Sequence, residues 1–289
     1  MLGIVTAMVI FGSISLFVKS CSISSGEIAL WRAVIALVVL LCFKLIRHEK
    51  LPFRQIKKDI IPLFITGAAI GFNWILLFEA YRYTSVSIAT LSYYFCPVLV
   101  MVLSPVIFKE RISLKQWLCF AFATVGLVLI IGARAGGYDN ELYGIALGLA
   151  AACLYAFVVL MNKKITSVGG IDKTIYQFFG TIAVLLVYVP LTTGFEVLSL
   201  NSRGLISIAI LGVVHTGIAY CMYFSAVGKL SGQKVAILSY IDPLVAVIIS
   251  FTLLNEQITV MQLVGGAMIL GFTLLNELGS RNKAPKIKN

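Results

Sequence analysis

Apolar residues recur along the whole chain in stretches of about 20, separated by short polar segments. An α-helix of roughly 20 residues is long enough to cross about 30 Å of hydrocarbon. Lipid offers no hydrogen-bonding partner to the backbone, so each stretch is expected to be a helix. The pattern predicts ten spans, over residues 2–18, 26–46, 60–80, 84–108, 114–132, 142–162, 174–192, 205–227, 233–254 and 259–277.

The composition excludes a water-soluble protein. The 289 residues are 60% hydrophobic and only 12% charged, with a mean hydropathy of +1.00. An ordinary soluble domain carries about 25% charged residues, and no soluble core of this size could bury so much apolar side chain. A soluble enzyme, a disordered linker protein and a soluble nucleic-acid binder are therefore excluded. The fold class expected is an all-α integral membrane protein.

The net charge of +11 is explained by membrane topology. Of the 23 Lys and Arg residues, 18 fall on one side of the predicted bundle, four fall on the other, and Arg32 lies within a span. The positive-inside rule places the richer side in the cytoplasm. Both termini are therefore predicted to be cytoplasmic, in a multi-pass protein of the cytoplasmic membrane. The basic loops and the tail at 279–289 are expected to face anionic lipid, with no nucleic-acid partner.

The chain also contains an internal repeat. A shift of 146 positions gives ten identities over the 46 positions of segment 71–116, and none of them is Leu or Val. The matched pairs are Gly71 with Gly217, Phe78 with Phe224, Ala80 with Ala226, Ser85 with Ser231, Tyr94 with Tyr240, Pro97 with Pro243, Ser104 with Ser250, Glu110 with Glu256, Ile112 with Ile258 and Gln116 with Gln262. Five spans per half is an odd number, so the halves 1–132 and 142–278 are predicted to be inverted relative to each other, as in many secondary transporters.

Short motifs in both halves resemble those of one transporter family. They are Phe11-Gly12-Ser13, Ala29-Leu30-Trp31-Arg32-Ala33, the run from Tyr81 through Ser85, Ala89, Pro97 and Glu110, and the run from Pro243 to Asn255-Glu256. With these motifs the whole chain resembles a ten-helix member of the drug/metabolite transporter superfamily, of the EamA-domain type. The resemblance implies secondary transport of a small organic metabolite, with efflux as the favoured direction. The family usually has Trp at the position of Phe11. A role of that Trp in the cavity is therefore not assigned to Phe11.

Signatures of enzymes and of ATP-driven pumps are missing from the sequence. It contains no H-E-x-x-H, D-D-x-x-D or G-x-S-x-G motif and no Walker lysine loop. No cofactor and no metal ion are therefore expected. The six cysteines include no C-x-x-C pair, and they are interpreted as small buried hydrophobic residues.

Asp242 is the clearest ionisable candidate for function. A charged group at the centre of a span costs about 2.5–3.5 kcal/mol on insertion scales, so such groups are candidates for function. Asp242 lies in the ninth predicted span, and Pro243 follows it and frees the carbonyl of Ser239. A carboxylate there could bind a proton, as coupling ion, or a cationic group of a substrate. The alternative is a structural acid paired with Lys234 or with a backbone donor.

Arg32 and His215 are further candidates, each with a structural alternative. Arg32 could bind a substrate carboxylate through its guanidinium, or form a buried ion pair with Glu27 or Glu79. His215, in the middle of the eighth predicted span, could relay protons, or be a neutral, hydrogen-bonded core residue.

Aromatic residues with a polar tip are candidates for lining a substrate cavity, although Trp and Tyr also populate the membrane interface. Tyr94 and Tyr240 are the strongest, because each lies just before one of the matched prolines, Pro97 and Pro243. These two prolines are predicted to act as equivalent hinges of gates at opposite ends of the cavity. The other candidates are Trp74, Tyr93, Tyr155, Tyr220 and Tyr223, with Asn73 as a polar group inside a span.

Three functions remain open from the sequence alone. The favoured one is export of a small organic metabolite, such as an amino acid or a related amphipathic solute. The alternatives are import of a cationic or nutrient molecule, and a membrane sensor or scaffold that transports nothing. A homodimer is a further possibility, with Gly265-Gly266 as its contact face.

Overall fold

Seven helices among the described residues are long and apolar enough to cross a membrane. The structure, a computed structural model, describes residues 1–108, 113–132, 140–227, 230 and 232–280, and these form helices and connecting segments without strands. The three remaining predicted spans coincide with the shorter apolar segments Leu2–Val18, Ile237–Thr252 and Val260–Asn276. The protein is therefore a multi-pass, all-helical membrane protein. The basic tail predicted at 279–289 lies outside the described residues from 281 onward.

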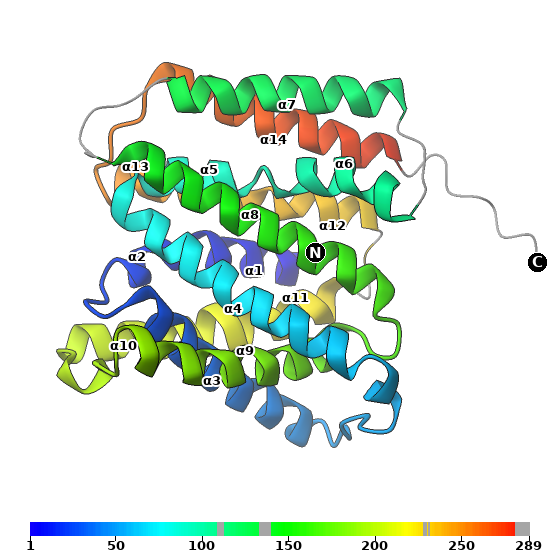
Figure 1. Ribbon diagram of the computed structural model, residues 1–289, viewed down its shortest axis with the longest axis vertical. Helices are drawn as coiled ribbons and strands as arrows, with labels where there is room; N and C mark the ends of the chain where they lie inside the picture. Colours follow the sequence, from blue (N-terminus) through cyan, green and yellow to red (C-terminus); the bar gives the residue numbers. More distant parts are fainter. Residues whose placement is uncertain (109–112, 133–139, 228–229, 231, 281–289) are drawn as a thin grey trace, which may run out of the picture.

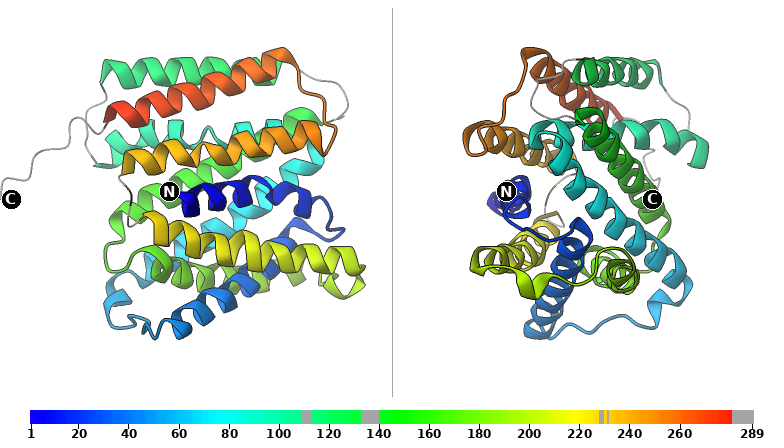
Figure 2. Two further views of the ribbon diagram at one scale, coloured as in Figure 1. Left: turned by 180° about the vertical axis from the view of Figure 1, so that it is seen from behind. Right: turned by 60° about the vertical axis from the view of Figure 1, so that its left-hand side comes forward.

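The uninterrupted helices lie along one axis, which is horizontal in Figure 1. The helices α3 (Ser25–Ile46), α8 (Glu141–Lys164) and α14 (Val260–Ser280) run in one direction, and α4 (Ile60–Tyr83), α7 (Leu114–Gly132) and α9 (Gly170–Thr192) run in the other. The end at which α3 and α8 finish carries Lys44, Lys163 and Lys164 in their last turns, and we call it the basic end. The other end, where α4 finishes and α5 begins, is called the opposite end (Figures 1 and 2).

The other predicted spans are built from shorter pieces. The first consists of α1 (Leu2–Gly12) and α2 (Ile14–Val18), which meet at Ser13. The eighth consists of α10 (Ser202–Ile210), the π-helix η3 (Leu211–Ile218) and α11 (Ala219–Val227), which follow one another directly. Two short 3₁₀ helices, η1 (Gln55–Lys58) and η2 (Val197–Ser199), lie in the connections.

Two spans are interrupted at matched positions of the sequence repeat. Residues 94–95 separate α5 (Val86–Tyr93) from α6 (Cys96–Phe108), and Tyr240 separates α12 (Gly232–Ser239) from α13 (Ile241–Thr252). Pro97 and Pro243 lie in the first turns of α6 and α13. Proline fits the first turn of a helix, but it lacks the amide that would bond back to the preceding turn. Each matched proline therefore accompanies a break in its span.

The helices α7 and α14, which the repeat pairs, lie side by side and run in opposite directions (Figures 1 and 2). Both begin with the same cap. The Ser113 and Thr259 amides donate to the Gln116 and Gln262 side chains at 2.8 and 2.9 Å. The Gln amides in turn donate to the Ser113 and Thr259 hydroxyls at 3.3 and 3.2 Å. This reciprocal capping box starts a helix efficiently.

Candidate functional site

A cavity of about 390 Å³ lies between the two ends of the bundle. Helices α1, α3, α4, α5, α6, α8, α9, α11 and α13 contribute to its wall, so both halves of the chain line it. Aromatic rings form a large part of the wall. The rings are Phe11, Trp74, Phe78, Tyr81, Tyr93, Tyr94, Tyr155, Phe178, Tyr220, Tyr223 and Phe224. An apolar wall with a few polar groups is typical of a small-molecule site.

Arg32 on α3 places a guanidinium in this wall although the residue is only 4% exposed. Its Cζ lies 4.0 Å from the centroid of the Trp74 ring, and its Nε donates to Thr216 Oγ1 at 2.6 Å. The cation–π contact and the hydrogen bond hold the group in one orientation. No described residue accepts a hydrogen bond from its two Nη groups. The guanidinium fork is therefore available to a ligand.

The π-helix η3 explains how Thr216 reaches Arg32. Thr216 Oγ1 donates to the Leu211 carbonyl, five residues earlier, at 2.9 Å, and this leaves an oxygen lone pair for Arg32. A π-helical turn is rare and often marks a functional site. Arg32 is thus fixed by a neutral hydroxyl, and neither Glu27 nor Glu79 pairs with it. Glu27 accepts from the Glu196 and Val197 amides at 2.8 Å each, and Glu79 lies 3.6 Å from Arg82.

Asp242 lies at the start of α13, next to the interruption of its span. Its Oδ2 accepts a hydrogen bond from Tyr94 Oη at 2.6 Å, and no described residue binds Oδ1. Lys234 is exposed and forms no ion pair with Asp242, so the pairing with Lys234 that was predicted as one alternative is not formed. A carboxylate oxygen facing an aromatic cavity can bind a proton or an ammonium group.

The two charges occupy separate parts of the same cavity. Arg32, Asp242, Tyr81 and Tyr220 all line the cavity, and Arg32 and Asp242 form no ion pair with each other. The cavity therefore offers a positive and a negative pole joined by aromatic surface.

The structure gathers most of the predicted site residues around this cavity and leaves three outside it. Arg32, Asp242, Trp74, Tyr94, Tyr155, Tyr220, Asn73 and Pro97 line the cavity. His215, Tyr240 and Pro243 do not line it. The matched pairs Tyr94/Tyr240 and Pro97/Pro243 are therefore not equivalent in this conformation, in which the first member of each pair faces the cavity.

His215 lies behind the cavity wall, where it is 2% exposed. Its Nε2 is 3.0 Å from Ser13 Oγ, its Nδ1 is 3.3 Å from the Ile210 carbonyl oxygen, and its ring lies against Phe17 at 4.9 Å. These contacts favour the interpretation of a hydrogen-bonded core histidine. Asn73 lines the cavity but also joins α4 to α8, because its Nδ2 donates to the Ala151 carbonyl at 2.7 Å.

Phe11 and Gly12 each have a place at the site. The Phe11 ring lines the cavity and meets Tyr220 edge-on, with centroids 5.5 Å apart, so an aromatic residue is retained where the family usually has Trp. Gly12 lies against α13, and a Cβ there would be 2.5 Å from the Asp242 carbonyl oxygen. The absence of a side chain allows α1 to approach the residue that carries the negative pole.

Some residues of the site are not predicted by the sequence, and the face predicted to form a dimer is covered. Phe78, Tyr81 and Thr216 were not predicted as site residues, although Tyr81 begins one of the family motifs and Phe78 is identical to Phe224 in the repeat. Gly265-Gly266, predicted as a dimer face, is covered within the chain. A Cβ at Gly265 would be 2.4 Å from the Gly126 carbonyl oxygen, and one at Gly266 would be 2.6 Å from the Leu91 side chain.

Comparisons with known proteins agree on one family. The profile of the EamA-like transporter family matches residues 1–132 and 142–277. An uncharacterized transporter of Bacillus subtilis, YxxF, is 28% identical over 96% of this chain and 90% of its own. A probable amino-acid metabolite efflux pump of Salmonella typhimurium is 27% identical over 63% of this chain and 64% of its own. A crystal structure aligns with 98% of both chains at a TM-score of 0.67 and 19% identity, and thus shares the fold.

Proposed function

The chain belongs to the EamA-like transporter family, which is a family of transporters and not of enzymes, and on that premise we propose that it exports a small zwitterionic metabolite, such as an amino acid. Substrate would cross through the aromatic cavity by secondary transport. Export is favoured because the Salmonella relative is named as an efflux pump.

The observation that carries this proposal is the pair of opposite poles in one cavity. The Nη groups of Arg32 are free to bind a carboxylate in two parallel hydrogen bonds. Oδ1 of Asp242 is free to bind an ammonium group, and the aromatic rings in the cavity wall suit an apolar side chain or backbone. The cavity volume, about 390 Å³, lies within the range of roughly 300–1,000 Å³ of small-molecule sites.

Asp242 would also couple transport to protons. A carboxylate that binds either an ammonium group or a proton, but not both, exchanges one for the other. An inward proton gradient would then drive the ammonium-bearing substrate outward. Tyr94 remains hydrogen-bonded to Asp242 Oδ2 and orients the carboxylate toward the cavity.

The architecture proposed is ten spans in two inverted halves, 1–132 and 142–278, with both termini in the cytoplasm. The capping boxes that begin α7 and α14, and the interruptions near Pro97 and Pro243, support it because they recur at the same positions of the two halves. Inverted halves present similar gates to the two sides of the membrane. The basic end would face the cytoplasm.

Transport by the purified protein in liposomes tests this proposal. A panel of radiolabelled amino acids, organic amines and carboxylic acids is offered under an imposed pH gradient, and the direction of net movement is recorded. Proton-driven movement of zwitterions, above that of empty liposomes, is the expected result. Movement of amines alone would favour the alternative of a cation transporter, and no movement of any compound would favour a sensor or scaffold.

A further inference from the structure

The central cavity ends at two stacked rings near the opposite end of the bundle. Phe78 and Tyr81 on α4 line the cavity, and they also line a second cavity of about 340 Å³, which we call the vestibule. The other vestibule residues include Lys19, Ser22, Ser25 and Arg82. The ring centroids of Phe78 and Tyr81 are 6.5 Å apart, and the residues are 1% and 5% exposed. These two rings therefore separate the cavity from the vestibule.

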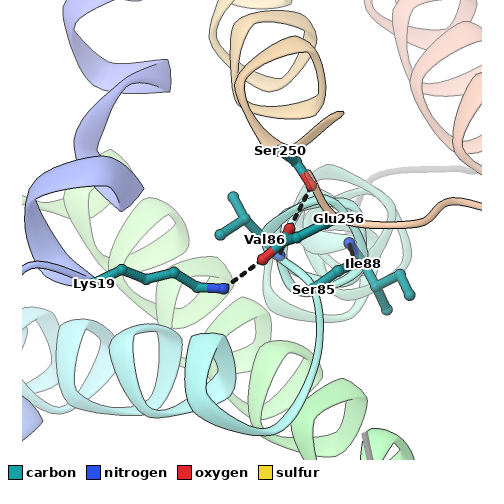
Figure 3. A network of polar contacts seen from close by, with 6 residues as sticks. All are labelled: Lys19, Ser85, Val86, Ile88, Ser250 and Glu256. Atoms are coloured by element: carbon teal, nitrogen blue, oxygen red, sulfur yellow. Dashed lines mark hydrogen bonds and ion pairs between the residues drawn. The ribbon is translucent and has the colours of Figure 1, made fainter. Parts of the chain in front are cut away.

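Beside the vestibule, the Glu256 carboxylate binds Lys19, Val86 and Ser250 among the described residues (Figure 3). Oε1 forms an ion pair with Lys19, the residue that follows α2, and Oε2 accepts from the Ser250 hydroxyl on α13. Oε2 also accepts from the Val86 amide, the first of α5, at 2.7 Å. Glu256 is 9% exposed. A buried carboxylate that accepts from a charged donor and a helix amide makes strong, short hydrogen bonds.

These partners come from both halves of the chain. Lys19 and Val86 belong to the first half, and Ser250 and Glu256 belong to the second. The carboxylate therefore ties α2 and α5 to α13 beside the vestibule, where the halves would have to part for substrate to leave. Within the part of the chain that the structure describes, Glu79, another carboxylate at this end, bonds to the first half, to Ser25 at 2.6 Å and to Arg82.

We propose that Glu256 is the latch that holds the opposite end of the cavity closed, and that the transport cycle breaks and remakes its bonds to Lys19 and Val86. This inference rests on the proposed function, because only a transporter needs both ends to open in turn. Phe78 and Tyr81 form the gate, and Glu256 acts on it as a positioning residue, by holding together the helices around the vestibule.

Labelling of a cysteine below the gate tests the latch without any substrate. Leu77, a cavity residue one turn before Tyr81, is replaced in Leu77→Cys in a background that lacks the six native cysteines. A small membrane-impermeant thiol reagent is then added to vesicles of either orientation. With Glu256→Gln, the labelling rate from the side of the opposite end is expected to rise about tenfold, since the charge-assisted bonds that favour the closed state are lost.

Three further variants separate a latch from a merely structural residue. Lys19→Gln removes the ion pair but keeps the bonds to Ser250 and Val86, so a smaller rise on the same side is expected even where Glu256→Gln folds poorly. Glu79→Gln is the matched control, expected to leave the rate unchanged. A double variant of Glu256→Gln and Lys19→Gln should match Glu256→Gln alone in labelling, because the ion pair is already lost.

An unchanged rate in both Glu256→Gln and Lys19→Gln would overturn the latch, and so would an equal rise from both sides. Neither result bears on substrate choice, which the liposome panel measures. Conversely, a one-sided rise in labelling would stand even if no zwitterion were transported.

Discussion

Tyr94 donates a hydrogen bond of 2.6 Å to Asp242, and this bond joins the two interrupted spans. Tyr94 lies between α5 and α6, and Asp242 lies in the first turn of α13. The repeat matches Tyr94 to Tyr240 and Asp242 to Cys96. The contact equivalent to Tyr94–Asp242 would therefore be made by Tyr240 and Cys96. If the two halves exchanged their conformations, the equivalent contact would involve other side chains. The Tyr94–Asp242 bond can therefore distinguish the two conformations.

Replacement of Asp242 by Asn is the direct test of coupling. Asp242→Asn keeps the size of the side chain and can still accept from Tyr94, but it fixes the neutral state. We expect the variant to exchange substrate weakly across the membrane and to lose accumulation against a gradient, measured in liposomes with and without an imposed pH difference. Asp242→Glu keeps the acid and should retain some coupling. Full accumulation in Asp242→Asn would show that protons are coupled elsewhere, with His215 the next group to change.

The matched prolines are predicted to set the rate of gate movement. Pro97→Ala and Pro243→Ala restore an amide that can bond to the preceding turn and stiffen the break. Each variant should transport more slowly while its amount in the membrane and its thermal unfolding temperature stay near those of the wild type. Pro190→Ala, inside α9 and away from both breaks, is a suitable control. Normal rates in both hinge variants would remove the hinge role.

Gly12 is predicted to be intolerant of even a methyl group. A Cβ there would meet the Asp242 carbonyl oxygen at 2.5 Å and the Val245 Cβ at 2.7 Å, and neither atom belongs to the end of a flexible side chain. Overpacking of this kind costs about 1–3 kcal/mol, so Gly12→Ala should unfold at a lower temperature and transport poorly. Gly132→Ala is the control, because a Cβ at Gly132 has nothing within 4 Å. Equal unfolding temperatures for the two variants would contradict the close contact.

Membrane topology is predicted from the distribution of basic residues. Single cysteines at Gln55, near the basic end, and at Leu198, which is 97% exposed, are expected to be labelled from opposite sides. Residue 55 should react only from the cytoplasm and residue 198 only from outside. Labelling of both positions from one side would contradict the ten-span architecture together with its inverted halves.

The sequence could predict the helices and part of the cavity, because both follow from local patterns. Hydrophobic length identified the spans, and the repeat identified Pro97 and Pro243 next to their breaks. Arg32 and Asp242 were found because charge inside a span is costly. The grouping of these two residues in one cavity depends on how α3 and α13 pack, which no periodicity encodes. The same holds for Thr216, whose bond to Arg32 requires a π-helical turn, and for the loop position that brings Glu256 to Val86.

Recognition of both charges of the substrate is most directly measured by competition with matched analogues. A transported amino acid is compared with its N-acetyl derivative, which lacks the ammonium group, and with its methyl ester, which lacks the carboxylate. In wild-type liposomes only the zwitterion should compete well. In Arg32→Gln the zwitterion should lose about ten- to a hundredfold in affinity, since hydrogen bonds to charged groups contribute about 1.5–3 kcal/mol. The methyl ester should bind to this variant as weakly as it does to wild type. Equal competition by all three compounds in wild type, or an unchanged affinity in Arg32→Gln, would contradict recognition of a zwitterion by these two poles.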